Sequence, residues 1–286
     1  MARIAIIGGG SIGEALLSGL LRAGRQAKDI AVAEKNPERA RFLSEKYSVL
    51  QTSVADAAEN ATYIVIAVKP SDVATALVDI AEGATQAENN SAEQVFVSVA
   101  AGVSTAYYEA KLPAGAPVVR VMPNTPALVG AGVSAMAPGR FATPEQVKEV
   151  AAIFKAVGGV LEVPESQMDV VTAVSGSGPA YFFLMIEALV DAGVAEGLPR
   201  EVATDLVVQT MDGSAAMLLQ RMDAQKQGDD TVVDTSAAQL RAQVTSPGGT
   251  TAAGLRELER GGLRAAVADA VSAAKTRSEQ LGITSE

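Results

Sequence analysis

The first thirteen residues, MARIAIIGGGSIG, constrain the fold more than any other stretch of the chain. An apolar run at residues 3–7 leads directly into GGGSIG, where Gly8, Gly10 and Gly13 fit the pattern G-x-G-x-x-G, and helical spacing then continues to Gly24. In that pattern the first glycine permits a tight turn, the second lets backbone approach a pyrophosphate, and the third lets helix and strand pack closely. The same glycines would also make a tight turn without a ligand, but their place between strand and helix favours a dinucleotide site.

Strand-length apolar runs and helical segments alternate through the first half of the chain. Further runs occupy residues 30–33, 63–68, 95–100 and 118–122. Asn36-Pro37 and the capping-box sequence TPEQ at 143–146 have the cap-then-proline pattern of helix starts. This alternation predicts an α/β fold with a doubly wound, mostly parallel sheet of the Rossmann type.

The pattern changes after the run GGVLEV at residues 158–163. Strand-like runs largely stop, and long apolar helices are expected at 179–195, 199–219 and 263–281. We therefore expect a nucleotide-binding domain over residues 1–163 and an all-helical domain over 164–286. The polar stretches 82–93 and 222–236 are expected to be surface loops.

Composition excludes several classes of function. The 23 Lys and Arg against 33 Asp and Glu give a net charge of −10, which opposes nucleic acid and anionic lipid. The chain has no Cys and no His, so disulfides, thiol nucleophiles, Ser-His-Asp triads and imidazole metal sites are excluded. We expect no metal, since no dense Asp/Asn cluster stands out. No uninterrupted apolar run approaches membrane-spanning length, so we expect no membrane span and a cytoplasmic protein.

Residues at the end of the second predicted strand are expected to bind the adenosine 2′ group of the cofactor and so to distinguish NAD from NADP. Glu34 lies where an acid would hold a ribose 2′-OH and favour NAD. Lys35, Arg39 and Arg41 follow, and such cations would hold a 2′-phosphate and favour NADP. All four side chains would also suit a solvated surface, so the residues leave the choice of cofactor open.

Two motifs combine glycine or proline with uncharged polar residues. In RVMPNTPALVGAG at 120–132, Asn124 offers neutral groups to a nicotinamide or a substrate, although a rigid strand exit explains the motif equally well. In TSPGGTT at 245–251, free N–H groups at a helix start would bind a carboxylate without a cation, and a threonine hydroxyl would meet a substrate nitrogen. An ordinary capped helix start is the alternative. A third motif, SGSGPAY at 175–181, is best explained as a helix cap.

These motifs together resemble a known family. The chain is similar over nearly its whole length to Δ1-pyrroline-5-carboxylate reductases, through the blocks IGGGSIGEALLSGLL, AVKP (67–70), VAAGV (99–103), MPNTPALVGAG (122–132), AVSGSGPAYFF (173–183) and SPGGTTAAGLRELERGGLRAAV (246–267). The resemblance implies hydride transfer from NAD(P)H to the C=N carbon of 1-pyrroline-5-carboxylate, which gives L-proline in the last step of proline biosynthesis. It also implies a homodimer formed through the helical domain, often assembled into a decamer.

The resemblance assigns residues as well. The implied cofactor contacts are Ile7, Gly8, Gly9, Gly10, Ser11, Ile12, Lys35, Asn36, Ala67, Val68, Lys69, Pro70, Val99, Ala100, Ala101, Met122, Pro123 and Asn124. The implied substrate contacts are Asn124, Val244, Ser246, Gly248, Gly249, Thr250 and Thr251, with Thr251 as the catalytic residue that hydrogen-bonds the imine nitrogen. NADPH is the expected cofactor, with NADH as the alternative. The chain departs from the family where many members have HPxxLKD before SPGG, because it reads SAAQLRAQV there.

Two other functions compete with this interpretation. A β-hydroxyacid dehydrogenase shares the two-domain order, but its general acid/base is typically a helical-domain Lys, and Lys226 and Lys275 are not well placed for that role. A non-catalytic NAD(P)-sensing protein would keep the glycine turn but would not need the SPGGTT loop. The absence of His and Cys fits a reductase, since NAD(P)H carries the chemistry and the protein supplies position and electrostatics.

Overall fold

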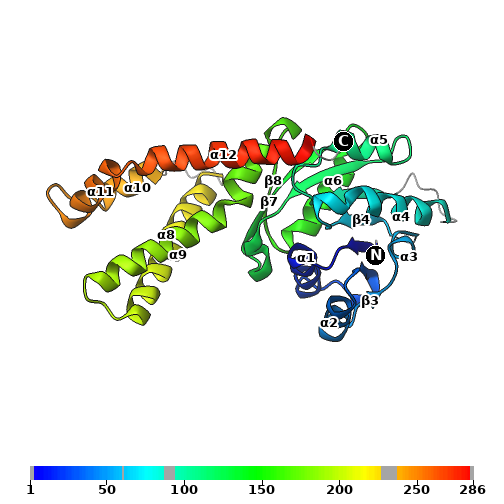
Figure 1. Ribbon diagram of the computed structural model, residues 1–286, viewed down its shortest axis with the longest axis horizontal. Coiled ribbons are helices and arrows are strands. Elements are labelled where there is room, and N and C mark those ends of the chain that lie inside the picture. Colours follow the sequence, from blue (N-terminus) through cyan, green and yellow to red (C-terminus); the bar gives the residue numbers. More distant parts are fainter. Residues whose placement is uncertain (1–2, 60, 87–93, 227–236, 284–286) are drawn as a thin grey trace. The chain divides into compact units, whose positions relative to one another are not determined.

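The computed structural model describes residues 3–59, 61–86, 94–226 and 237–283, which form two compact units (Figure 1). The first unit contains residues 1–179 together with 271–286, and the second contains residues 180–270. The last strand ends at Glu162, where the sequence predicts the change to helices. By its contacts, the first unit continues to Pro179 and takes up the end of the last helix.

The first unit is built on an eight-stranded sheet with the order β3-β2-β1-β4-β5-β6-β7-β8. Its strands are β1 (Ile4–Ile7), β2 (Ile30–Ala33), β3 (Leu50–Gln51), β4 (Tyr63–Ile66), β5 (Val95–Ser98), β6 (Val118–Met122), β7 (Gly132–Pro138) and β8 (Gly158–Glu162). Within the described residues, the pairing of β6 with β7 is antiparallel and the other strand pairs are parallel. The predicted doubly wound, mostly parallel sheet is therefore confirmed, and β7 is an addition that the apolar runs did not reveal.

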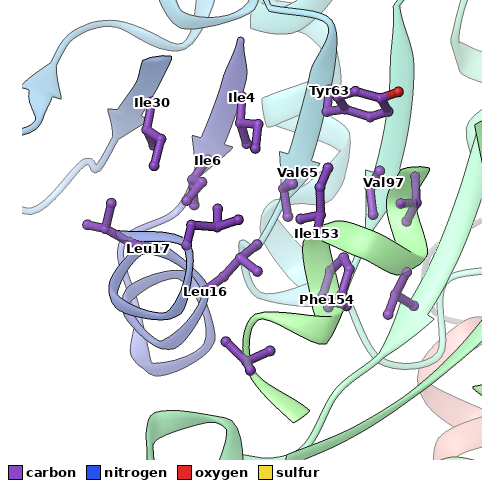
Figure 2. Close-up of a cluster of buried hydrophobic side chains, with 14 of the residues drawn as sticks. Ile4, Ile6, Leu16, Leu17, Ile30, Tyr63, Val65, Val97, Ile153 and Phe154 are labelled. Atoms are coloured by element: carbon purple, nitrogen blue, oxygen red, sulfur yellow. The ribbon is translucent and has the colours of Figure 1, made fainter. Parts of the chain in front are cut away.

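Helices cover both faces of this sheet because its strands are apolar on both faces. Ile4 and Ile6 point to one face, where they pack with Leu16 of α1 (Ser11–Arg22) and Phe154 of α6 (Pro144–Lys155) (Figure 2). The helix α2 (Pro37–Tyr47) packs on the same face through Leu43. The opposite face is covered by α3 (Val54–Glu59), α4 (Val73–Gln86) and α5 (Thr105–Lys111).

Predicted helix starts in the first unit are confirmed in detail. The Asn36 side chain accepts from the backbone N–H groups of Glu38 and Arg39, which caps α2. Thr143 and Gln146 form the reciprocal capping box that begins α6. The helix α4 continues to Gln86, so residues 82–86 of the predicted loop 82–93 are helical. Residues 87–93 of that loop lie outside the described residues.

All regular elements of the second unit in its described residues, 180–226 and 237–270, are helices, as the sequence predicts. Its helices are α8 (Gly178–Ala195), α9 (Arg200–Lys226), α10 (Ala237–Gln243), α11 (Thr250–Arg260) and the start of α12 (Leu263–Ile283). Arg221 joins α9 to α10 by donating to Gln239 at 3.1 Å and to Gln243 at 2.8 Å. Residues 222–226 of the predicted loop 222–236 belong to α9, and residues 227–236 lie outside the described residues.

The helix α8 exposes large apolar side chains. Phe182, Phe183 and Leu184 are each more than 60 % exposed in the single chain. By length and composition alone, the helical stretch Glu165–Ala195 would suffice to cross a membrane, which differs from the expectation drawn from the lack of an uninterrupted apolar run. An exposed apolar surface of this kind needs a cover, which is either lipid or another protein surface.

Candidate functional site

Five of the predicted cofactor segments lie at one edge of the sheet. In the strand register, Ile7 pairs with Ala33 and with Ile66, Ile66 pairs with Ser98, and Ser98 pairs with Arg120. The residues that follow these positions are the predicted segments 7–12, 35–36, 67–70, 99–101 and 122–124. The carboxyl ends of parallel strands are where doubly wound folds bind their ligands, so the structure brings the predicted cofactor residues together where a dinucleotide fits.

The glycine turn has the geometry that its pattern predicts. Gly8 has φ +106°, and a Cβ there would lie 2.6 Å from the Ala67 carbonyl oxygen. A Cβ at Gly13 would overlap the Gly8 carbonyl oxygen, so this glycine is what lets α1 approach β1. A Cβ at Gly10 would meet nothing within 4 Å, and no side chain caps α1 there. The N-terminus of α1 is thus open to a pyrophosphate, which fits a dinucleotide cofactor.

The residues expected to bind the adenosine 2′ group make hydrogen bonds and an ion pair within the protein. Glu34 accepts from Gly9 N at 2.7 Å and from Asn36 N at 2.8 Å, so its carboxylate braces the glycine turn. Lys35 is exposed and pairs with Asp72 at 2.6 Å, and this pairing raises the pKa of Lys35. Arg39 donates to the Gly9 carbonyl at 2.7 Å. Two of the three candidate cations therefore already have partners.

Glu14 is a partly buried acid behind the glycine turn that the sequence patterns did not single out. Glu14 in α1 receives the phenol of Tyr47 at 2.7 Å, the ammonium of Lys46 at 3.0 Å and the guanidinium of Arg39. Burial alone would raise the pKa of Glu14, but the hydrogen bonds from Tyr47, Lys46 and Arg39 outweigh it and lower the pKa to about 2. Through Arg39, this cluster holds the Gly9 carbonyl in place.

The lowered pKa of Glu14 predicts that the free energy of unfolding decreases at acidic pH. Because the pKa of Glu14 falls from 4.5 to about 2 on folding, its contribution is complete above pH 4.5 and is lost as the pH drops toward 2. We expect Glu14→Gln to reduce the free energy of unfolding by about 2 kcal/mol at pH 7. Urea unfolding of both proteins at pH 7 and pH 3 measures this. A difference that stays constant with pH would contradict the assignment.

The exits of β5 and β6 are shaped by internal hydrogen bonds. The Ser98 hydroxyl bonds the buried Tyr108 hydroxyl at 2.6 Å and accepts from Ala100 N at 3.2 Å, which shapes the loop after β5. Burial raises the pKa of Tyr108 to about 12, so this phenol stays neutral. Asn124 is buried, and its Oδ1 accepts from Val133 N at 2.9 Å. A ligand contact from Asn124 would therefore come from its amide nitrogen or from the second lone pair of Oδ1.

The TSPGGTT loop begins α11 in the second unit. Its residues 246–248 are exposed, and Thr251 is half-buried. Gly248 has φ +67°, which favours glycine, and Gly249 N donates to the Ser246 carbonyl at 3.0 Å. The expectation that both glycines offer free N–H groups is thus corrected for Gly249. Gly249 caps α11, so Thr250 and Thr251 are its first residues and not the cap, and their N–H groups point out of the helix start.

Comparison with known proteins decides the family. Residues 165–281 match the family described as "Pyrroline-5-carboxylate reductase dimerisation". Residues 3–102 match the family described as "NADP oxidoreductase coenzyme F420-dependent". A pyrroline-5-carboxylate reductase of Mycobacterium tuberculosis is 68 % identical over 100 % of this chain and 99 % of its own length. One from Mycobacterium leprae is also 68 % identical, over 100 % of this chain and 99 % of its own.

The chain belongs to the pyrroline-5-carboxylate reductase family.

Solved structures agree with this assignment. A pyrroline-5-carboxylate reductase from Coxiella burnetii has a TM-score of 0.85 and 34 % identity, with 98 % of both chains covered. A Plasmodium falciparum pyrroline carboxylate reductase with NADP bound has a TM-score of 0.82 and 31 % identity, again over 98 % of both chains. The chain is an NAD(P)H-dependent oxidoreductase of this family, and its residues 3–102 belong to an NADP-binding domain.

The family also accounts for the apolar surface of α8. The dimerisation model covers residues 165–281 and so includes all of α8 and its exposed phenylalanines. For the competing interpretation as a β-hydroxyacid dehydrogenase, the structure describes the side chain of one of the two lysines considered, Lys275. Lys275 pairs with Glu279 at 2.5 Å, and this pair raises the pKa of Lys275, which makes it a poorer proton donor at neutral pH. The side chain of Lys226 lies outside the described residues.

Proposed function

We propose that this chain reduces the C=N bond of 1-pyrroline-5-carboxylate with a hydride from NAD(P)H and releases L-proline. The observation that carries the proposal is 68 % identity to pyrroline-5-carboxylate reductases over the whole chain. The test is substrate-dependent oxidation of NAD(P)H by the purified protein, followed at the absorbance of the reduced nicotinamide. Absence of turnover with pyrroline-5-carboxylate would overturn the proposal, and binding of NADPH without turnover would favour a sensing role.

The proposed roles of the substrate loop follow from its geometry. The substrate carboxylate lies on Ser246, Gly248 and the N–H groups at the start of α11, where the positive end of the helix dipole offsets its charge. Gly249 N is bonded to Ser246 O, so Gly249 shapes the turn and does not donate to the substrate. Val244 forms the exposed apolar approach to the loop. A loop without cations holds the carboxylate without competing with the positive charge of a protonated imine.

Thr251 is the proposed catalytic residue. It lies in the first turn of α11, two residues after the cap, where its hydroxyl can hydrogen-bond the imine nitrogen while the carboxylate occupies the loop. The hydroxyl orients the ring and is not a strong acid, since an alcohol ionises far above neutral pH. We propose that solvent provides the proton, and that the protein's contribution is position and exclusion of water.

NADPH is the proposed cofactor, with Lys35 and Asn36 at its adenosine 2′ group. Lys35 lies two residues after the end of β2 and its side chain is 81 % exposed, so its ammonium can move from Asp72 to a 2′-phosphate. We expect Lys35→Glu to lower kcat/KM for NADPH about fivefold more than for NADH. The effect is modest because solvent screens a charge on the surface. Steady-state rates with both cofactors measure the ratio.

Asp72→Asn is the matched variant. It removes the partner that holds Lys35 and should therefore shift the ratio toward NADPH. If Lys35→Glu affects both cofactors equally and Asp72→Asn changes neither, Lys35 is only a surface charge.

The proposed assembly is a homodimer formed through the helical domain, with further association into a decamer. The presence of a dimerisation domain and the apolar surface of α8 support the dimer, and a partner subunit rather than lipid is the proposed cover for that surface. Sedimentation mass separates a dimer from a decamer. We propose a cytoplasmic location, consistent with a chain that has no Cys and a net charge of −10.

A further inference from the structure

The end of α12 packs directly on the loop that follows β5. A Cβ at Gly282 would lie 2.6 Å from the Gly102 carbonyl oxygen, so the helix approaches that backbone as closely as glycine allows. Gly102 has φ +79°, and a Cβ there would lie 3.0 Å from Gly282 N and 3.1 Å from Ser278 O. Gly102 follows the predicted cofactor segment Val99–Ala101 without a gap. The contact thus restricts the position of the segment Val99–Ala101 at the edge of the sheet.

A second contact joins the same helix end to the exit of β6. Ser278 is 2 % exposed, and its hydroxyl donates to Asp169 at 2.6 Å. Asp169 faces the buried guanidinium of Arg120 at 3.7 Å, and Arg120 is also bonded to Glu165 at 2.9 Å. Arg120 lies in β6 two residues before Met122, where the segment 122–124 leaves the sheet.

The two contacts converge on neighbouring strands. Ser98 at the end of β5 pairs with Arg120 in β6, so the loop held by Gly282 and the strand held through Ser278 are adjacent at the ligand edge. Glu165 joins them further, because its carboxylate also accepts from Thr105 N, three residues after Gly102. Nothing in the proposed hydride transfer uses Gly282, Ser278 or Asp169. The burial of Ser278 and the close packing of Gly282 next to two cofactor segments therefore call for another role.

We propose that the last two turns of α12, through Ser278 and Gly282, position the segments 99–101 and 122–124 and thereby set the affinity of the enzyme for NAD(P)H. These are positioning residues, since they act through Gly102 and Arg120 and touch no reacting atom. The inference rests on the proposed reductase function. It predicts that the helix end controls the KM for the cofactor far more than it controls kcat.

The test replaces Gly282 by leucine in the full-length enzyme. Leucine is a better helix former than glycine, so any loss cannot be ascribed to a weaker helix. We expect the KM for NADPH to rise about tenfold with kcat at saturating NADPH within a factor of two, since small displacements at a binding segment carry large costs. Gln280→Leu is the matched control, because Gln280 lies on the same turn and is exposed. It should behave as the unchanged enzyme.

A second variant guards against a folding defect. Ser278→Ala removes one hydroxyl without adding bulk, and we expect it to raise the KM for NADPH about threefold, as loss of one hydrogen bond would. Ser272→Ala on the same helix is its control. Direct binding of NADPH, read from the fluorescence of its nicotinamide, should weaken in parallel with KM even without substrate.

Three outcomes separate the possibilities. Unchanged KM and binding in folded Gly282→Leu and Ser278→Ala would overturn the inference, as would a fall in kcat with no change in KM. If Gly282→Leu does not fold, Ser278→Ala decides by the same criteria. If the unchanged enzyme binds NADPH but does not reduce pyrroline-5-carboxylate, the proposed function fails while the binding measurements still judge the role of α12.

Discussion

Replacing Thr251 by alanine is expected to lower kcat by about a hundredfold, comparable to removing one hydrogen-bond donor from a reacting centre. The affinity for NADPH should stay nearly unchanged, because Thr251 lies in the helical unit and the predicted cofactor segments lie at the edge of the sheet. Turnover at saturating concentrations of both substrates and a separate NADPH titration measure the two quantities.

Thr251→Ser is the matched control for this prediction. It keeps the hydroxyl and removes only a methyl group, so it should recover most of the lost turnover. An equal loss in both variants would show that the methyl group packs and that the hydroxyl does not act. A parallel loss of NADPH affinity in Thr251→Ala would refute the assignment of Thr251 to the imine nitrogen.

Replacing Gly13 by alanine is expected to remove NAD(P)H binding and to destabilise the first unit by about 3 kcal/mol, the upper range for overpacking. The added methyl group would overlap the Gly8 carbonyl oxygen. Because that oxygen belongs to the backbone, it cannot rotate away as a side chain could. Thermal unfolding and nicotinamide fluorescence test the two parts of the prediction.

Gly10→Ala provides the contrast within the same motif. A Cβ at Gly10 meets nothing within 4 Å in the protein, and its φ of −65° suits any residue, so the fold should keep its stability. The methyl group would instead occupy space that a pyrophosphate needs, so NADPH binding should still weaken. If Gly10→Ala binds NADPH normally, the phosphate loop does not run where the pattern puts it.

Local patterns predicted those parts of the fold that depend on local interactions. The glycine turn, the Asn36 cap and the Thr143 capping box each involve residues a few positions apart, and each is present. The strand β7 was missed because its sequence, GVSAMAP, mixes glycine, serine and alanine and lacks an apolar run. Its place in the sheet comes from pairing with β6 and β8, which no short window of sequence records.

The site was less predictable where side chains choose between partners. Glu34 was a candidate for the ribose, yet its carboxylate binds the N–H groups of Gly9 and Asn36. Glu14 has no feature in the sequence that distinguishes it from a surface acid in a helix, although three donors converge on it in the fold. Such choices depend on contacts across 25 or more residues, so only the folded chain reveals them.

The return of α12 to the first unit has a consequence for how the chain is made. Residues 180–270 form the second unit, and the chain then comes back to complete the first with residues 271–283. During synthesis residues 180–270 leave the ribosome before residues 271–283, so the nucleotide-binding unit cannot take up the end of α12 until the helical unit has emerged. A fragment that stops at residue 163 or 179 therefore lacks residues 271–283, which belong to the nucleotide-binding unit.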